Sequence, residues 1–259
     1  MVSLSLHLPV SGETVEVRAL TGADDLFLLE HASRGPWLAT AFLGRVATRS
    51  DGKALDFTAL SLSDIDVALL ELRRALLGDY VSTAVRCTAS ECAAWFDVSF
   101  QVSDYLRHHL PRGARVTEAS EPGWFRFKDS EVSFRLPTVA DVLALAEATD
   151  LERQLAARCI RPGATPALRR RVETAMQRLA PSLYSELDCA CHECGQAMSV
   201  TFDPSSYVLA ELARRARDVY DEVHLLARSY HWAERDILAL PQERRQRYAE
   251  LAHAERSRA

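Results

Sequence analysis

Lysine is almost absent from this chain: it occurs at Lys53 and Lys128 only, and arginine supplies the remaining positive charge. The formal net charge of −5 at pH 7 gives no general attraction to nucleic acid or to anionic membranes. No stretch approaches 18 continuous apolar residues, so we expect no membrane-spanning helix. The first residues lack a basic start followed by a long apolar run, so we also expect no signal peptide and a cytoplasmic protein.

Motifs typical of enzymes are missing as well. The sequence contains no glycine-rich phosphate loop, no nucleophile elbow and no His-Glu-x-x-His motif. His224 and His231 lie seven residues apart, but no third ligand accompanies them, so we expect them to pack at the end of a helix. The arginine runs at 169–171 and 214–217 are typical of solvated helix faces. We therefore expect no enzyme and no small-molecule substrate.

An internal repeat is the most informative feature that is present. Residues 15–30 and 132–147 align without gaps, and each copy ends in a cysteine cluster followed by alternating apolar residues. The matched positions of the first parts are Val15, Val17, Arg18, Thr21, Ala23, Asp24, Leu26 and Glu30 with Val132, Phe134, Arg135, Thr138, Ala140, Asp141, Leu143 and Glu147. Thr21 with Asp24, and their counterparts in the second copy, are typical of helix caps, so their carboxylates need no catalytic explanation.

Five of the six cysteines lie in two tight clusters, which is typical of a metal site in a reducing compartment rather than of a disulfide framework. We predict one structural Zn²⁺ bound by Cys87, Cys92, Cys191 and Cys194, because two tight turns with two thiolates each satisfy tetrahedral zinc. Cys189 stays open as an alternative to Cys191, since the alignment pairs Cys189 with Cys87 whereas turn geometry favours Cys191. The sixth cysteine is expected in a helix core.

Two other interpretations of the cysteines remain. They are unligated small side chains in one interpretation, and in the other Cys191 and Cys194 form a thiol oxidoreductase motif. That motif usually opens a helix, whereas residues 198–202 have the alternation of a strand.

The order of elements predicts an α+β fold made of two tandem repeats that share one four-cysteine site. Each repeat is expected to contain a β-hairpin, helices, and a strand, cysteine knuckle and strand. The predicted divisions are a first lobe at 1–110, a linker at 111–123, a second lobe at 124–204 and a C-terminal helical arm at 205–259. The arm is expected to hold helices at 205–229, 233–238 and from 241 to about 255.

The knuckle Cys191-His-Glu-Cys194-Gly, the strand after it and residues 202–250 carry a resemblance to known proteins. This part resembles small proteins encoded with phage-like contractile tails and contractile injection systems, and loosely the baseplate hub assembly proteins of T-even-like phages. The first knuckle departs from the pattern, because four residues separate its cysteines and no glycine follows Cys92. The resemblance implies a non-enzymatic role in building a baseplate or tail, either as a chaperone or as a part of the finished particle.

The partners implied are other tail or baseplate proteins. An apolar set in the arm, formed by Trp232, Ile237, Leu238 and Leu240, is a candidate partner-binding face, and packing onto its own domain is the alternative. A second functional hypothesis is a zinc-ribbon nucleic-acid-binding regulator, but the acidic residues Glu91, Asp188 and Glu193 near the knuckles argue against it.

Overall fold

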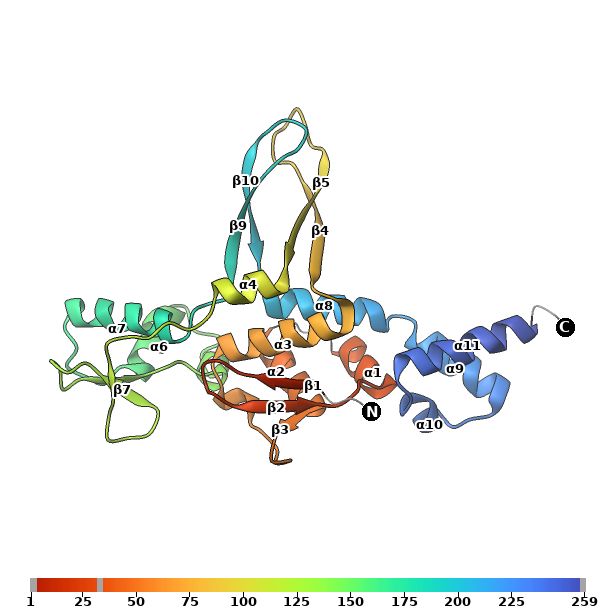
Figure 1. Cartoon of the computed structure of the whole chain (residues 1–259), viewed down its shortest axis with the longest axis horizontal. Coiled ribbons are helices and arrows are strands. Elements are labelled where there is room, and N and C mark those ends of the chain that lie inside the picture. The colour runs from red at the N-terminus through yellow and green to blue at the C-terminus, as the bar shows by residue number, and fades with distance from the viewer. Residues whose placement is uncertain (1–3, 32–34, 257–259) are drawn as a thin grey trace. The chain divides into compact units, whose positions relative to one another are not determined.

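The computed structural model describes residues 4–31 and 35–256, and it combines helices with small β-sheets, so the chain is an α+β protein (Figure 1). The described residues form two compact units, each built from separate stretches of chain. The first unit holds the described residues within 1–6, 14–55 and 206–259, and the second holds 7–13 and 56–205. The sequence pattern predicts a hairpin strand at 2–8 and a helix from about 21 to about 32, and residues 2, 3 and 32 lie outside the described residues.

The first unit contains a three-stranded sheet and helices from both ends of the chain. Its elements are β1 (Leu4–His7), β2 (Thr14–Val17), α1 (Gly22–Glu30), α2 (Pro36–Val46), β3 (Ala47–Arg49), α8 (Pro204–Ala216), α9 (Val219–Tyr230), α10 (Glu234–Leu238) and α11 (Gln242–Arg256). The last residue of β1 and the first two of α8 fall within the second unit. The sheet has the order β1-β2-β3, and Val17 pairs with Ala47 at the end of the antiparallel β2–β3 ladder. Phe42 and Leu43 of α2 are fully buried, so this helix supplies part of the core.

The second unit contains the remaining helices, a second three-stranded sheet and two β-ribbons. Its elements are a 3₁₀ turn (Phe57–Ala59), α3 (Leu62–Leu77), β4 (Tyr80–Arg86), β5 (Trp95–Gln101), α4 (Val102–His108), β6 (Thr117–Glu118), β7 (Trp124–Arg126), β8 (Ser133–Arg135), α5 (Val139–Leu143), α6 (Leu151–Cys159), α7 (Pro166–Leu179), β9 (Ser185–Ala190) and β10 (Ala197–Phe202). The sheet has the order β6-β7-β8, while β4 pairs with β5 and β9 pairs with β10. Both ribbons extend side by side away from α4 (Figure 1).

Two series of elements along the chain have a similar order. The first contains β1, β2, α1, α2, β3, the 3₁₀ turn, α3, the ribbon β4–β5 and α4. The second contains β7, β8, α5, α6, α7, the ribbon β9–β10 and α8, and no described strand takes the place of β3 in it. After the second helix of each series, the chain returns antiparallel to the preceding strand: Val17 pairs with Ala47, and Phe134 pairs with Ile160.

The helix starts matched in the sequence also share their hydrogen bonds. Arg18 donates to both carboxylate oxygens of Asp24 over 2.6 and 2.8 Å, and Asp24 accepts from the Thr21 amide over 2.9 Å. Arg135 donates to both oxygens of Asp141 over 2.5 and 2.8 Å, and Asp141 likewise accepts from the amide of its capping threonine. The Arg135 guanidinium holds the pKa of Asp141 well below its usual range. The expected helix caps are therefore present at both positions, and in each cap an arginine binds both oxygens of the aspartate.

The predicted domain divisions stay a prediction, and the compact units of the structure follow other boundaries. The compact units interleave along the chain, so residues 56–205 contain both knuckles and the expected linker. The stretch predicted as a linker contains β6. Its Ala114 and Val116 pack against a core of the second unit, because this contact removes their apolar side chains from water. The helix predicted at 205–229 is interrupted between α8 and α9.

Candidate metal centre

Each β-ribbon ends in a loop that carries two cysteines. In the first ribbon, the Cys87 amide donates to the carbonyl of Ala94 over 2.8 Å, which closes the loop directly beyond the strands. In the second, the Cys191 amide donates to the carbonyl of Gln196 over 2.9 Å in the same way. Gly195 has a φ of 72°, the left-handed conformation that glycine adopts without steric cost, so the tight second turn uses the glycine after Cys194.

The strand register decides which cysteine of the second cluster corresponds to Cys87. Cys87 directly follows β4 and Cys191 directly follows β9, whereas Cys189 lies within β9 and pairs with Met198 of β10. The Cys189 sulfur lies 3.6 Å from the Met198 carbonyl oxygen. A gapless alignment misplaces Cys189 because the second loop is shorter than the first. Turn geometry, which favoured Cys191, therefore identified the residue that the structure places beside the other three.

The four sulfurs of Cys87, Cys92, Cys191 and Cys194 all lie within 4.8 Å of one another. The Cys87 and Cys194 sulfurs are 3.6 Å apart, and those of Cys92 and Cys191 are 3.8 Å apart. A tetrahedron with metal–sulfur distances of about 2.3 Å has edges of about 3.8 Å. Both of these pairs join one ribbon to the other, so the group could hold one metal ion that links both ribbons.

Electrostatics of the group favour a cation. The backbone amides of Cys194 and Glu193 donate to the Cys191 sulfur and lower the pKa of this thiol to about 7. The Ala89 amide also lowers the pKa of Cys87, but burial and the three neighbouring thiols outweigh it and raise the pKa to about 12. One thiolate therefore forms readily while further ionisation is opposed by like charge. A divalent cation would outweigh the repulsion between the thiolates, because it stabilises every thiolate bound to it.

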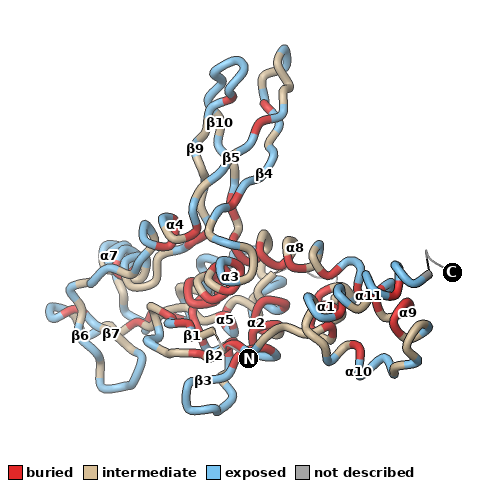
Figure 2. The backbone as a smooth tube through the Cα atoms, turned by 45° about the vertical axis from the view of Figure 1, so that its right-hand side comes forward, coloured by how far each residue is buried: buried red, intermediate tan, exposed pale blue. Residues whose placement is uncertain are grey.

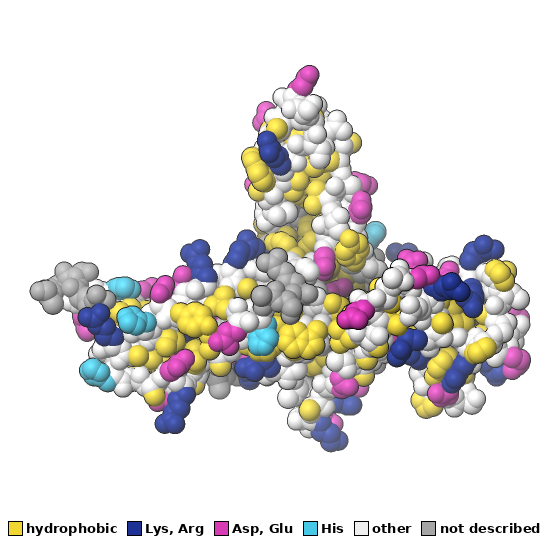
Figure 3. Space-filling view, turned by 180° about the vertical axis from the view of Figure 1, so that it is seen from behind, with side chains coloured by type: hydrophobic (Ala, Val, Ile, Leu, Met, Phe, Trp, Pro, Cys, Tyr) yellow, Lys and Arg dark blue, Asp and Glu magenta, His cyan; other side chains and the backbone are white. Residues whose placement is uncertain are grey.

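A small apolar cluster supports the ligands. Cys87, Phe96 and Cys191 are buried together, and Met198 and Val98 pack against them. The ring of His192 lies 5.5 Å from that of Phe96, centroid to centroid, although His192 itself is exposed. Figure 2 shows that the ribbons are otherwise largely exposed or half-buried, with short buried stretches near their loops and at the ends away from the loops. Figure 3 shows apolar side chains gathered along the ribbons.

Other predicted residues lie elsewhere. Cys159 is buried at the end of α6, as expected of a core cysteine, and burial raises its pKa. In the C-terminal arm, Ile237 is fully buried with Leu225 and Leu226, and Trp232 packs against this cluster. The partly buried Leu238 and Leu240 complete the predicted partner-binding set, whose role in binding stays a prediction.

One buried polar cluster was missed by the sequence analysis. In the first unit, the side chain of Arg245 is 1% exposed and donates to Asp25 over 2.6 Å and to Glu222 over 2.7 Å. Its third nitrogen donates to the carbonyl of Leu240 over 3.1 Å. The one local sequence feature related to this cluster is Gly22, which aligns with Val139. A Cβ at Gly22 would lie 2.6 Å from the Arg245 guanidinium, so glycine leaves room for the arginine.

Fold and site together define an α+β protein with two β-ribbons that bring four cysteines into one group that could hold a metal ion. Comparison with family models assigns residues 1–162 to the family described as T4 bacteriophage base plate protein. The match spans more than half of the chain, so this protein belongs to the T4 bacteriophage base plate protein family and its resemblance to phage baseplate proteins is confirmed. The matched residues include the first knuckle and precede the second, so they do not include the C-terminal stretch on which the resemblance was based.

Comparisons with curated proteins and with solved structures gave no match. Among the described residues, no helix combines the length and the apolar character that crossing a membrane requires. Membership of a baseplate family points to a structural role and to interactions with other baseplate proteins.

Proposed function

We propose that this chain is a non-enzymatic structural or assembly protein of the baseplate of a contractile, phage-tail-like particle, and that it contains one structural Zn²⁺. The observation that carries the proposal is the convergence of four sulfurs, from residues up to 107 positions apart, into one group within 4.8 Å. A tetrahedral site with four protein thiolates has no open position for a substrate, so its role is structural. The family membership supports the same conclusion.

The proposal includes a duplication of the fold. Two series of elements in a similar order, two helix caps bound by an arginine and two cysteine-bearing ribbons support this interpretation. Each copy supplies two thiolates, and neither ribbon alone supplies four. The metal would therefore stabilise the pairing of the two ribbons, which makes the protein a rigid building block or a chaperone for another tail component.

Two competing functions are less well supported. Cys194 is followed by strand β10 rather than by a helix, so the helical context typical of thiol oxidoreductases is missing at this motif. Glu91 and Glu193 are exposed in the two cysteine loops, where they would oppose binding of a phosphate backbone.

Metal analysis of the purified chain tests the proposal at the site. We expect one zinc per chain, and we expect Cys194→Ser to lose most of it because three thiolates bind zinc much more weakly than four. Cys194 is exposed, so its substitution leaves little packing defect. Cys189→Ser is the matched control, since this residue lies in β9 outside the sulfur group, and it should retain one zinc.

A zinc content of zero or two per chain, or equal loss of zinc in the two variants, would contradict the shared site. The role in assembly is tested separately in cells that produce the particle. Deletion of the gene should leave particles without complete baseplates when they are inspected by electron microscopy, and the wild-type gene should restore them. Complete, functional particles in the deletion strain would refute the assembly role.

A further inference from the structure

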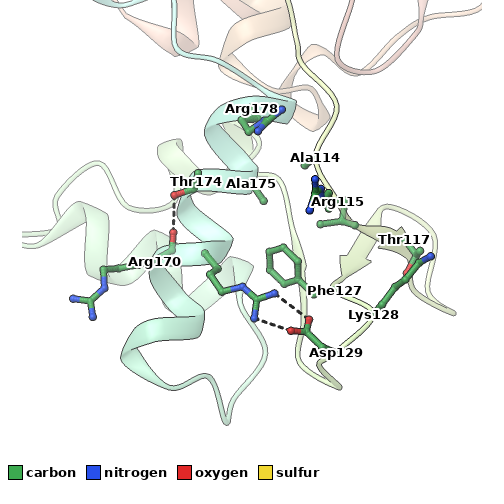
Figure 4. Close-up of a pocket in the computed structure, with 12 residues that line it drawn as sticks. Ala114, Arg115, Thr117, Phe127, Lys128, Asp129, Arg170, Thr174, Ala175 and Arg178 are labelled. Carbon is green, nitrogen blue, oxygen red and sulfur yellow. Dashed lines mark hydrogen bonds and ion pairs between the residues drawn. The ribbon is translucent and has the colours of Figure 1, made fainter.

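A large open groove lies in the second unit, apart from the cysteine group. It has a volume of about 1120 Å³ and lies between helix α7 on one side and residues 114–117 and 127–129 on the other (Figure 4). Small-molecule sites are typically about 300–1,000 Å³ and more enclosed. The size and openness of this groove therefore suit a segment of polypeptide better than a small ligand.

Positive charge without partners surrounds the groove. Arg115, Lys128, Arg170 and Arg178 all line it, and the described residues offer none of them an ion pair. Several other arginines of this unit do have carboxylate partners: Arg126, Arg135, Arg158, Arg161 and Arg171. The single carboxylate in the lining is that of Asp129, and Arg171 already binds it through two hydrogen bonds of 3.0 Å. A basic groove in a chain with a net charge of −5 indicates a local function.

The floor of the groove is apolar. Phe127 and Ala175 belong to the core of this unit, and Ala114 and Val116 pack against it. Figure 4 shows Arg115 and Arg178 close to this floor, whereas the side chain of Arg170 points away from Phe127 at the rim.

Residues 114–117 form one border of the groove, where the chain bends at Arg115 and enters strand β6 at Thr117. Among the described strands, β6 pairs only with β7. An extended segment could therefore lie alongside this edge and also use main-chain hydrogen bonds.

We propose that this groove binds an extended, acidic segment of a partner protein, in which carboxylates alternate with aliphatic side chains. The carboxylates would pair with Arg115 and Arg178, and the aliphatic side chains would cover the floor. That the partner is another baseplate component rests on the proposed function, whereas the chemistry of the segment rests on the groove alone.

Single-stranded nucleic acid fits the groove less well. Its binding sites usually offer exposed aromatic faces on which bases stack. Phe127 is the aromatic residue of the lining, but it is only 8% exposed and the guanidinium of Arg171 lies 4.5 Å above its ring. The apolar floor also has no counterpart in a phosphate backbone, but it matches aliphatic side chains.

Fluorescence anisotropy with the full-length chain tests the proposal. The probe is a short labelled peptide that alternates glutamate with leucine or valine, and its control replaces each glutamate by glutamine. A labelled oligothymidylate serves as the nucleic-acid probe. We expect the acidic peptide to bind at low salt and to bind more tightly than both other probes. Its affinity should fall as the salt concentration rises.

Charge reversal locates the binding site. The double variant R115E/R178E should weaken binding of the acidic peptide by about tenfold or more, because two attractive contacts become repulsive. The matched control R112E/R169E makes the same charge change on neighbouring exposed residues of the same two segments, outside the lining, and should weaken binding by less than about threefold.

Three results would overturn the proposal: no binding of the acidic peptide, equal weakening in both double variants, or tighter binding of the oligothymidylate. The zinc content of each variant is measured in parallel. Neither variant alters a cysteine, so failure of the groove proposal would leave the zinc content at one per chain and would not affect the proposed function.

Discussion

Arg245→Met is the sharpest test of how the first unit holds its C-terminal helices. Arg245 lies in α11, and its guanidinium joins this helix to Asp25 of α1 and Glu222 of α9. The side chains of both acids are at most 10% exposed. Methionine keeps most of the length of the arginine stem but provides no hydrogen-bond donor.

The expected loss of stability is large because the variant leaves two carboxylates behind. Removing one partner of a buried ion pair typically costs about 3–5 kcal/mol, since the remaining charge is buried without compensation. Here two acids lose the same partner, and Leu240 loses a hydrogen bond to its carbonyl as well. We therefore expect the free energy of unfolding to fall by about 3–5 kcal/mol at pH 7, a large part of the roughly 5–15 kcal/mol of a typical domain.

The pH dependence of the loss has a definite sign. Burial raises the pKa of Asp25 and of Glu222 even in the presence of Arg245. A raised carboxyl pKa means that the fold favours the protonated acid, so stability falls as the pH rises through that pKa. Without the guanidinium both pKa values should rise further. The loss should therefore be greatest near pH 7 and should shrink as the pH approaches the ordinary carboxyl range near 4.

Urea unfolding followed by circular dichroism measures the loss, and hydrogen exchange in α1, α9 and α11 localises it. Arg244→Met is the matched control, because Arg244 is the exposed neighbour of Arg245 in the same helix and should cost less than about 0.5 kcal/mol. If the two variants unfold within about 1 kcal/mol of each other at pH 7, the buried cluster does not hold the helices as argued.

Two further substitutions test close packing and burial. Gly22→Ala should cost about 1–3 kcal/mol in urea unfolding, because its new Cβ would lie 2.6 Å from the Arg245 guanidinium and 3.0 Å from the Leu238 backbone. Gly44→Ala, in open space on α2, should instead stabilise the chain by about 0.5–1 kcal/mol, and equal effects of the two would refute the packing argument. Burial raises the pKa of Asp66 to about 7, so wild-type stability should fall as the pH rises from the ordinary carboxyl range near 4 to about 7, and should level off above it. Asp66→Asn should remove that slope, and an unchanged slope would contradict the assignment.

The group of four cysteines could be predicted because the two cysteines of each loop lie close together in the sequence. Cys191 and Cys194 lie on one tight turn, and the internal repeat supplied the partner pair Cys87 and Cys92. The helix caps at Asp24 and Asp141 were predictable for the same reason, since a cap involves residues only three positions apart. Such features need no knowledge of tertiary structure.

Contacts between distant residues could not be predicted in this way. Arg245 and Asp25 are 220 positions apart, and Arg245 sits in an arginine-rich helix whose pattern predicts exposure. The groove likewise joins α7 to residues 114–117, which had the composition of a linker. The break between α8 and α9 falls near Asp218, where neither proline nor glycine marks it. In each case the arrangement depends on packing, which no local pattern encodes.

The two ribbons are the part of this fold whose stability would depend most on a metal ion bound by the four cysteines. An isolated two-stranded ribbon is at best marginally stable in water, and β4–β5 and β9–β10 bury few side chains besides Cys87, Phe96 and Cys191. A structural zinc can contribute on the order of 10 kcal/mol to folding, and here it would join Cys92 to Cys191, 99 positions away. The stability of the core around Phe134 and Val172 does not depend on zinc, because apolar side chains bury one another there. Zinc would therefore stabilise the ribbons above all, and a partner that binds the ribbons would depend on zinc while one that binds the groove would not.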